Sequence, residues 1–342
     1  MFMKGEVAAM EPFGGEHTRK VRVAWLYYIE GLTQDAIAAQ LGVTRMRVQR
    51  LLAQARDEGL VRITITDPSA ETIALAAELK RLVGLSDALV TPAPTDPAYV
   101  RRFIGHAAAE YLADCLHDDM SLGVGWGMTL EETARALPAR LLDRFSVVSL
   151  MGGLTRSSAL NPHEIAWQLA RTLRGECFYL AAPTYADSRT ARDAILGESA
   201  IRDVLERGRT VDAALVSVGA FGPDSTMRTS GLLNADDARA LEQGGAVGDL
   251  LGSQIDAVGH VVATDVNDRV IALSPADLRA IETVILASGG EDKTAIIGAA
   301  LHGRYVDVLI TDEATAARLV GAERERAALQ AAPPLTVPVE AS

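Results

Sequence analysis

The first sixty residues carry hydrophobic positions at helical spacing. Four apolar residues recur at intervals of one to four positions, as they would on one face of a helix: Val21, Trp25, Tyr28 and Ile29. The pattern predicts an amphipathic helix over 18–30 that buries this face and ends at Gly31, because glycine is a common stop.

Two more helices are expected directly afterwards. Thr33 can cap a helix that runs through Gln40, Gly42 suits the tight turn that follows, and Thr44 can cap a third helix. The residues expected to face inward from these helices and their turn are Ile37, Leu41, Val43, Val48, Leu51 and Leu52. Two short helices joined by a glycine turn are typical of a helix-turn-helix.

A change of pattern follows the third helix. The segment "LVRITIT" (60–66) alternates apolar and polar residues, which predicts a strand and hence a wing beside the helices. Asp67-Pro68-Ser69 is a predicted boundary, and a linker helix is expected from Ala70 to Val83.

The rest of the chain alternates short apolar runs with helical stretches. The predicted strands are 87–92, 121–125, 146–151, 177–183, 213–219, 259–264, 284–288 and 307–311. The predicted helices are 100–116, 130–137, 164–173, 191–207, 236–241, 294–301 and 312–320. Buried strands that alternate with helices predict an α/β fold, a mostly parallel sheet with helices on both faces.

The domain organisation follows from these patterns. We expect a flexible N-terminus (1–17), a helix-turn-helix domain of winged-helix type (18–66), a linker helix (67–84), a larger α/β domain (85–325) and a C-terminal tail (326–342).

Charge is divided unevenly between these parts. The segment 18–62 holds eight basic and four acidic residues, so it carries +4, whereas the whole chain carries −12. A small basic module attached to an acidic body indicates that only one end meets a polyanion.

Composition excludes several classes of protein. The chain has no apolar run long enough for a membrane span and no apolar signal segment, and Cys115 and Cys177 lack metal-binding or redox spacing. The six histidines show no HxH or HExxH pattern, so no metal and no cofactor is expected. We expect a cytoplasmic protein.

The third helix has the residues of a DNA reader. The side chains expected to contact DNA lie at the start of the second helix and along the outer side of the third: Thr33, Gln34, Thr44, Arg45, Met46, Arg47, Gln49 and Arg50. Arginine pairs bidentately with guanine and glutamine with adenine in the major groove. The alternative is a helical hairpin with a solvated basic face.

Glycines gather where predicted strands end. "SLGVGWGMTL" runs into a helix, "SLMGGL" repeats the device, and "ASGGEDKTA" places Lys293 just before another helix. Backbone N–H groups at such helix starts bind anions, and ligands of parallel sheets lie beyond the carboxyl ends of strands. The pattern therefore predicts a phosphate-binding rim, although each glycine could also serve only a tight turn.

Taken in order, these motifs resemble the SorC/DeoR-type sugar-binding transcriptional regulators, from Thr18 to Val320. The specific pieces include "GLTQDAIAAQLGVTRMRVQRLL", "LGVGWGMTL", "GAVGDLLG" and "GGEDKTAIIGAALHGRYVDVLITDEATA". The resemblance implies an effector domain similar in fold to glucosamine-6-phosphate deaminases and ribose-5-phosphate isomerases, assembly as a homodimer or homotetramer, and control by a sugar phosphate, sugar or polyol.

The resemblance also implies an effector site. Its residues would be Gly125, Trp126, Gly127, Thr129, Gly152, Gly153, Asn161, Asp249 and Lys293. One segment departs from the family: "LTRSSALNPHE" lacks the acid and glutamine found in sensors of sugar bisphosphates. This departure counts against a bisphosphate effector and makes a monophosphate or an unphosphorylated polyol at least as well supported.

The leading hypothesis is a repressor that binds double-stranded operator DNA and releases it in response to its effector. The first alternative is a sugar-phosphate isomerase or deaminase with an added DNA-binding domain, in which Asp249 and Lys293 would act as base and acid. The second is an architectural DNA binder without an effector. No catalytic residue is expected under the leading hypothesis.

Overall fold

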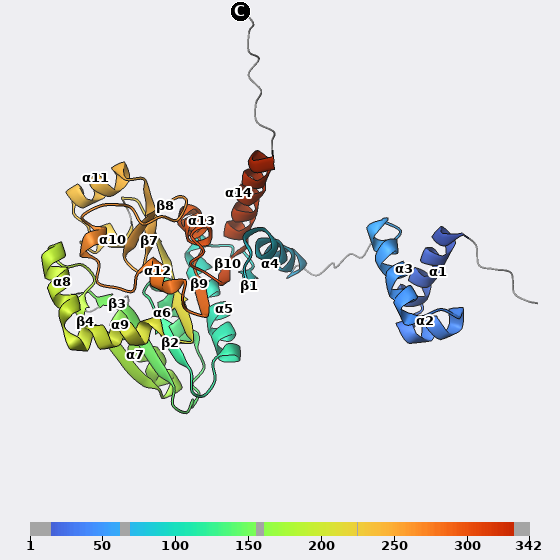
Figure 1. Ribbon diagram of the computed structural model, residues 1–342, viewed down its shortest axis with the longest axis horizontal. Helices are drawn as coiled ribbons and strands as arrows, with labels where there is room; N and C mark the ends of the chain where they lie inside the picture. Colours follow the sequence, from blue (N-terminus) through green and yellow to red (C-terminus); the bar gives the residue numbers. More distant parts are fainter. Residues whose placement is uncertain (1–14, 62–68, 155–160, 224, 332–342) are drawn as a thin grey trace, which may run out of the picture. The chain divides into compact units, whose positions relative to one another are not determined.

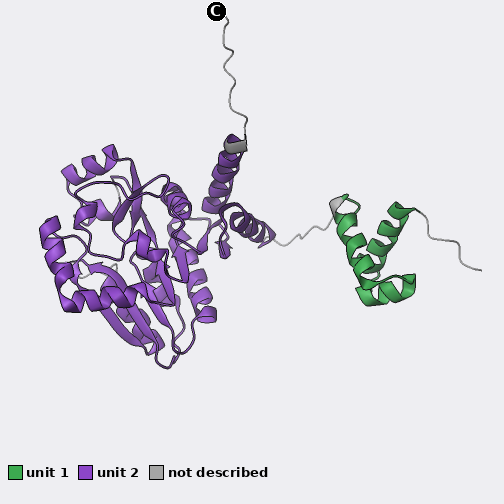
Figure 2. Cartoon of the chain, in the orientation of Figure 1, with its two compact units in different colours: residues 1–67 green, residues 68–342 purple. Residues whose placement is uncertain are grey.

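The computed structural model describes residues 15–61, 69–154, 161–223 and 225–331. The chain forms two compact units that divide between Asp67 and Pro68 (Figures 1 and 2). The described residues of the first unit form helices, and those of the second form alternating strands and helices.

The first unit is a bundle of three helices in its described part, α1 (Glu16–Tyr28), α2 (Gln34–Leu41) and α3 (Arg45–Asp57). Both predicted caps are confirmed: Thr33 Oγ1 accepts the Ala36 N–H at 3.2 Å, and Thr44 Oγ1 accepts the Arg47 N–H at 3.2 Å. Gly42 adopts φ +63°, the left-handed conformation required of the turn.

The expected inward face of α1 is wrong. Val21, Trp25 and Ile29 are 45, 56 and 65% exposed, whereas Val23 and Leu26 are buried against α3. The segment "VRVAWLYYI" is apolar on both sides, so helical spacing alone fits either stripe. Val43, expected in the core, is 38% exposed as well.

The core of this unit comes from all three helices. Its buried members are Val23, Ala24, Leu26, Ile37, Ala38, Val48, Leu51, Leu52 and Ala55. Lys20 is nearly buried too, and its ammonium pairs with the carboxylate of Glu58. The strand predicted over 60–66 lies mostly outside the described residues.

The second unit is built on a seven-stranded sheet in the part of the chain that the structure describes. Its strands are β1 (Asp87–Thr91), β2 (Ser121–Val124), β3 (Ser146–Gly153), β4 (Glu176–Pro183), β5 (Ala213–Val216), β9 (Thr283–Ala287) and β10 (Val308–Asp312). The order is β1-β10-β9-β5-β2-β3-β4, and every pairing is parallel. The predicted parallel α/β fold is confirmed.

Helices cover both faces of this sheet (Figure 1). The helices in the described part of the second unit are α4 (Ser69–Val83), α5 (Val100–Cys115), α6 (Met128–Ala136), α7 (Pro162–Leu173), α8 (Arg189–Gly197), α9 (Ser199–Arg209), α10 (Thr226–Thr229), α11 (Ala235–Gln243), α12 (Pro275–Leu278), α13 (Thr294–His302) and α14 (Glu313–Ala331). Three single 3₁₀ turns are η1 (Pro97–Tyr99), η2 (Asn267–Arg269) and η3 (Glu291–Lys293).

Successive strand residues enter two separate cores. In β5, Ala213 and Leu215 pack with α5, α6 and α7, whereas Ala214 and Val216 pack with α4, α9, α13 and α14. This alternation is the normal consequence of strand geometry when both faces of a sheet are covered.

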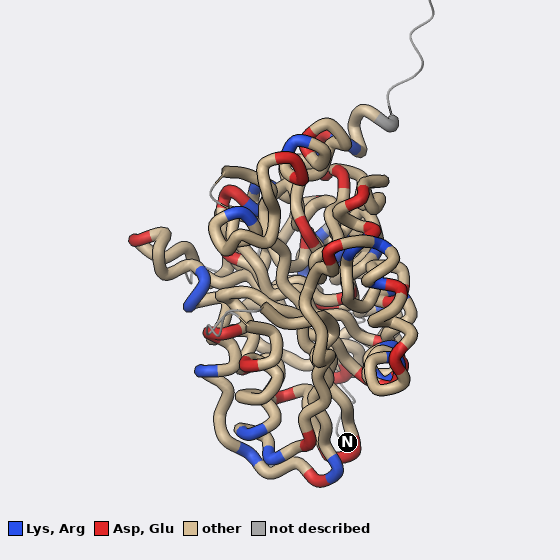
Figure 3. The backbone as a smooth tube through the Cα atoms, turned by 90° about the vertical axis from the view of Figure 1, so that its left-hand side faces the viewer, with Lys and Arg blue, Asp and Glu red and all other residues tan. Residues whose placement is uncertain are grey.

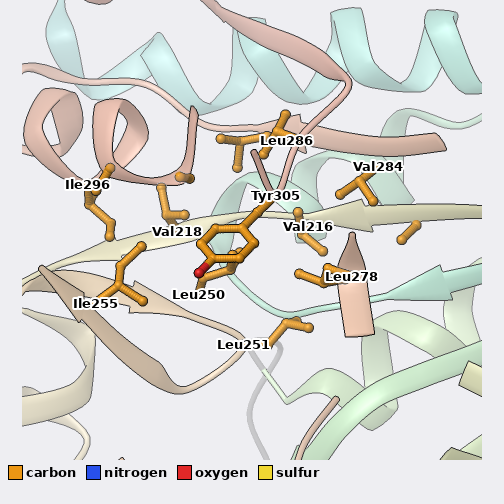
Figure 4. Packing of buried hydrophobic residues seen from close by; sticks show 14 of the residues in the cluster. Val216, Val218, Leu250, Leu251, Ile255, Leu278, Val284, Leu286, Ile296 and Tyr305 are labelled. Carbon is orange, nitrogen blue, oxygen red and sulfur yellow. The ribbon is translucent and has the colours of Figure 1, made fainter. Parts of the chain in front are cut away.

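A small antiparallel sheet adds residues to the core that contains Ala214 and Val216. It contains β6 (Val218–Ala220), β7 (Ala246–Leu250) and β8 (Ser253–Asp256). The predicted strand 213–219 therefore breaks at Ser217, after which the chain leaves the parallel sheet. Figure 4 shows Tyr305 among apolar side chains of both sheets and α13, which join the two sheets into one core.

Three further expectations about elements are wrong. Residues 259–264 make only an isolated bridge, between Ile255 and Val261, and no strand. The helix expected over 191–207 is two helices, because Glu198 is extended between α8 and α9. The last helix runs past Gly321 to Ala331, since the residues after that glycine are strong helix formers.

Candidate functional site

A cavity of about 330 Å³ opens where β2 and the small sheet end. Five segments supply its wall: residues 126–128, 218–223, 225–227, Asp249 and 292–293. The cavity thus lies beyond the carboxyl end of a parallel strand, where α/β sheets hold their ligands.

Asp249 is the buried acid of this cavity. It stands on β7 directly opposite Gly219 on β6, and its side chain is almost fully buried. A Cβ atom on Gly219 would lie 2.3 Å from Asp249 Oδ1, so glycine at that position makes room for the carboxylate. Asp249 Oδ2 accepts the Gly252 N–H at 3.1 Å.

The surroundings of Asp249 favour its neutral form. Burial raises the pKa of Asp249 to about 6, because a charge loses its hydration there. The Gly252 N–H, the Trp126 indole and the ammonium of Lys293 lower this pKa by less. The group therefore titrates near neutral pH, and its ionised form would accept hydrogen bonds from ligand hydroxyls.

Lys293 supplies the positive charge of the cavity. It ends η3 and stands at the N-cap of α13. Burial lowers its pKa, against the raising effect of Asp292 and Asp249. Among the described residues no carboxylate oxygen lies within 4.0 Å of its Nζ, so the ammonium faces the cavity without an ion pair.

The glycine loop forms a third side of the cavity. Trp126 is 5% exposed, and Gly127 adopts φ +129°, a conformation that side chains rarely allow, at the N-cap of α6. Gly125 does not reach the wall; its N–H bonds Leu215 O at 2.9 Å, and a Cβ there would lie 2.9 Å from Leu251.

The structure does not bring four other predicted residues to the described wall. Gly152 and Gly153 let β3 approach Pro183 and His163, where a Cβ would lie 2.3 and 2.5 Å away. The Gly152 N–H is already bonded to Ile271 O. These glycines serve packing in the described part of the chain.

Asn161 and Thr129 have local surroundings of their own. Asn161 caps α7, accepting the His163 N–H at 3.2 Å and donating to Leu154 O at 3.1 Å. Thr129 lies in the first turn of α6 with its hydroxyl buried and without a hydrogen-bond partner among the described residues. Residues 155–160, next to Asn161, lie outside the described chain.

Sequence reasoning missed much of the cavity wall. The loop after β6, "AFGP", and the short helix α10 contribute Phe221, Ser225 and Met227, and Asp292 joins from η3. The Gly-Pro pair in "AFGPDSTM" signalled a loop, but nothing in that pattern placed it opposite Trp126.

The outer face of α3 is clear from its buried side. Val48, Leu51, Leu52 and Ala55 enter the core, which leaves Met46, Gln49 and Arg50 exposed on the opposite side. Met46 is 73% exposed. This is the arrangement of a recognition helix, with both polar readers on one face.

Two of the expected DNA contacts already have acidic partners. Arg45 Nη1 lies 3.4 Å from Asp35 Oδ2, and Arg47 Nη2 lies 3.6 Å from Glu16 Oε1. Gln34 begins α2, whose cap is Thr33, as Thr44 is of α3.

Other kinds of site find little support in the described residues. None of their helices has the length and apolarity of a membrane span. No three histidine, cysteine or acidic side chains in the described ranges are grouped as a metal site. On the side seen in Figure 3, acidic and basic positions are interspersed along the described backbone.

Comparisons with known proteins match both units. Residues 67–321 match the family described as "Putative sugar-binding domain", and residues 22–58 match "Sigma-70, region 4". The chain is 31% identical to the erythritol catabolism regulatory protein EryD of Brucella abortus, over 88% of this chain and 96% of that protein. It is 32% identical to the deoxyribonucleoside regulator of Bacillus subtilis, with the same coverage.

A solved structure is also similar to most of this chain. The full-length sorbitol operon regulator SorC from Klebsiella pneumoniae matches with a TM-score of 0.69 and 26% identity, over 88% of this chain and 98% of that one. The named relatives are transcriptional regulators, which favours regulation over the enzyme alternative. This chain belongs to the SorC/DeoR-type family of sugar-binding transcriptional regulators.

Proposed function

We propose that this regulator is a repressor of a sugar or polyol catabolic operon, and that an effector bound between Asp249 and Lys293 releases it from DNA. The observation that carries the proposal is that one cavity holds a buried acid, Asp249, and the ammonium of Lys293, which has no ion pair among the described residues. A polyol offers hydroxyl donors to the first and oxygen acceptors to the second.

The charges of the cavity narrow the class of effector. Asp292, and Asp249 when it is ionised, would repel a second phosphate, so a bisphosphate would meet more repulsion than a monophosphate. A monophosphate with its anionic end at Lys293 and its hydroxyls at Asp249 fits better, and so does a neutral polyol. The names of the relatives point to erythritol, deoxyribonucleosides and sorbitol as starting compounds.

The DNA-binding residues of the proposal lie on one unit. Met46, Gln49 and Arg50 would enter the major groove, while Thr33, Gln34 and Thr44 at the helix starts would contact phosphates. An operator with two-fold symmetry would be bound by a homodimer or a homotetramer. The regulator would act in the cytoplasm.

A two-part experiment tests the proposal. Full-length protein is screened by thermal shift against erythritol, sorbitol and deoxyribose and their monophosphates. Each compound that binds is then added to the complex between the protein and DNA taken from upstream of the gene that encodes the protein. Release of DNA by a stabilising compound supports the proposal; stabilisation without any change in DNA affinity contradicts it.

The same compounds decide the enzyme alternative. Ketose–aldose conversion or release of ammonia by the full-length protein would show that Asp249 and Lys293 act on a substrate. The described wall of the cavity holds no histidine, and its acid and ammonium are farther apart than an ion pair. We therefore expect binding without turnover.

A further inference from the structure

Helix α14 packs at its start against η3, which ends at Lys293, and further along against the linker helix α4 (Figure 1). Its first residues lie beside the loop that carries Lys293, and α4 follows the DNA-binding unit in the chain.

The first contact locks the cavity loop to the start of α14. Asp312 is 2% exposed, and its Oδ2 accepts the Gly290 N–H at 2.9 Å and the Thr315 hydroxyl at 2.6 Å. Asp312 Oδ1 accepts the Thr315 N–H at 3.0 Å, and the Gly290 N–H is shared with Thr315 Oγ1 at 2.9 Å. A Cβ on Gly289 would lie 2.2 Å from Asp312 Oδ2.

This network leaves the loop little freedom to move alone. One buried carboxylate caps α14 and holds the backbone N–H of Gly290, three residues before Lys293. Buried carboxylates with several N–H and O–H donors form strong, directional hydrogen bonds. A displacement of the loop therefore acts on the first turn of α14.

A second contact lies on the surface one turn along the helix. Arg318 Nη1 lies 2.6 Å from Glu291 Oε1, and the side-chain hydrogen bond from Arg318 lowers the pKa of Glu291. Both side chains are exposed, so the pair adds little stability. It links η3, which ends at Lys293, to α14.

The middle of α14 packs against α4. Arg324 donates through Nε and Nη2 to the two carboxylate oxygens of Glu78, each at 2.8 Å. Beneath this bidentate pair, Leu79 of α4 is fully buried in the same core as Leu319 and Val320. Bidentate geometry fixes both the distance and the orientation of the two helices.

We propose that α14 transmits the state of the effector cavity to the linker helix α4. Occupancy at Lys293 would shift η3, the Asp312 network and Arg318 would carry the shift into α14, and the packed face with Glu78 would pass it to α4. The inference rests on the proposed role of Lys293 as an effector contact. Two sites coupled in this way must bias one common element, which here is α14.

Hydrogen exchange of the full-length protein tests the proposal with inorganic phosphate as the probe, against chloride at equal ionic strength. In the unaltered chain we expect phosphate to slow exchange in the loop 290–294, in the first turn of α14 and in α4. In Arg318→Glu, where two acids face each other, the loop should still respond and the response of α4 should be weakened, because the Asp312 network alone then links the loop to α14.

Two further variants sharpen the result. The exchange of charges in Glu291→Arg with Arg318→Glu should restore the response of α4. Arg326→Glu is a matched control, because Arg326 has the same 45% side-chain exposure as Arg318 and pairs with Glu323 of its own helix. A response of α4 that is undiminished in Arg318→Glu, or is weakened equally in Arg326→Glu, overturns the inference.

A ligand-free measurement separates this inference from the proposed function. If phosphate leaves the loop unchanged in the unaltered chain, the anion site is contradicted, and Thr315→Val decides the coupling without ligand. Loss of the bridging hydroxyl should speed exchange in both the loop and α4, with α7 unchanged. A change in exchange that is confined to the loop and the first turn of α14 refutes transmission. If exchange in α7 also changes, Thr315→Val has disturbed the fold. Ligand-free Arg318→Glu is then measured instead, and exchange must change in both the loop and α4 while α7 stays unchanged.

Discussion

At the scale of single residues, Asp249 stands out because its burial opposes its charge. Its pKa is raised to about 6 in the folded protein, whereas an unfolded aspartate titrates near 3.8. Between these values the folded state holds a proton that the unfolded state has released, so the free energy of unfolding falls as pH rises through the window. The carboxylate therefore reduces stability at neutral pH.

This sign predicts the effect of Asp249→Asn. The amide does not titrate, so the variant should gain stability relative to the unaltered protein between pH 4 and pH 7, by about 2–3 kcal/mol. Urea unfolding of both proteins at several pH values measures the difference. A difference that is independent of pH would show that Asp249 is ionised throughout, contrary to its burial.

Lys293 gives the second prediction at this scale. Lys293→Met keeps the apolar length of the side chain and removes the ammonium, so a phosphorylated effector should lose about 1.5–3 kcal/mol of binding, as expected for a charged hydrogen bond. A neutral polyol should lose less. Calorimetric titration with a polyol and its monophosphate compares them, and equal losses would indicate damage to the fold.

Residue types allowed Asp249 and Lys293 to be predicted, but not the cavity itself. The glycine turn before it marked Lys293 as a candidate, the family resemblance marked Asp249, and the structure brings both to one wall. Gly152 and Gly153 followed a predicted strand in the same way, but they lie close to Pro183 and His163 instead. A glycine in sequence does not reveal whether a ligand or another backbone fills the space of its missing side chain.

At the scale of elements, α1 shows what periodicity leaves undecided. Its two apolar stripes fit a helix equally well, and only the docking of α3 selects Val23 and Leu26. Leu26→Ala should therefore destabilise the helical unit by about 2–5 kcal/mol, whereas Trp25→Ala should cost much less. Thermal unfolding followed by circular dichroism measures both, and a reversed order would restore the face predicted from sequence.

The exposure of side chains on α3 indicates which arginine should matter most for DNA binding. Arg50 lies on the exposed face with Met46 and Gln49, whereas the side chain of Arg47 is 31% exposed and lies beside Glu16. Arg50→Ala should weaken operator binding by about 1–3 kcal/mol if the contact is to a base. Arg56→Ala, at the far end of α3, is the matched control, and an equal loss in both would point to general electrostatics.

The parallel sheet was readable from sequence and the small sheet was not. Buried runs such as 146–151 and 307–311 carry a strong signal because both faces are covered. The β7–β8 hairpin turns at Leu251 and Gly252, both with positive φ. A fully buried leucine rarely adopts that conformation, so no turn signal marked this hairpin.

At the scale of the whole molecule, two units with opposite net charge belong to one regulator. The three-helix unit was readable because its caps and turn glycine fall at fixed spacings, and family membership was readable because the motifs follow one another in order along both units. The route between effector and DNA was not, since the link from Asp312 to Gly290 joins residues that no local pattern relates. Coupling of this kind is a property of the folded chain.

Regulation of DNA binding by an effector must be reciprocal. If the effector weakens operator binding by a given factor, the operator must weaken effector binding by the same factor, in the range of about 5–150-fold typical of allosteric proteins. Calorimetric titration of the effector into free protein and into protein saturated with operator DNA measures this factor. An effector affinity that saturating operator leaves unchanged would favour an architectural DNA binder, or an enzyme whose DNA-binding unit acts independently of its cavity.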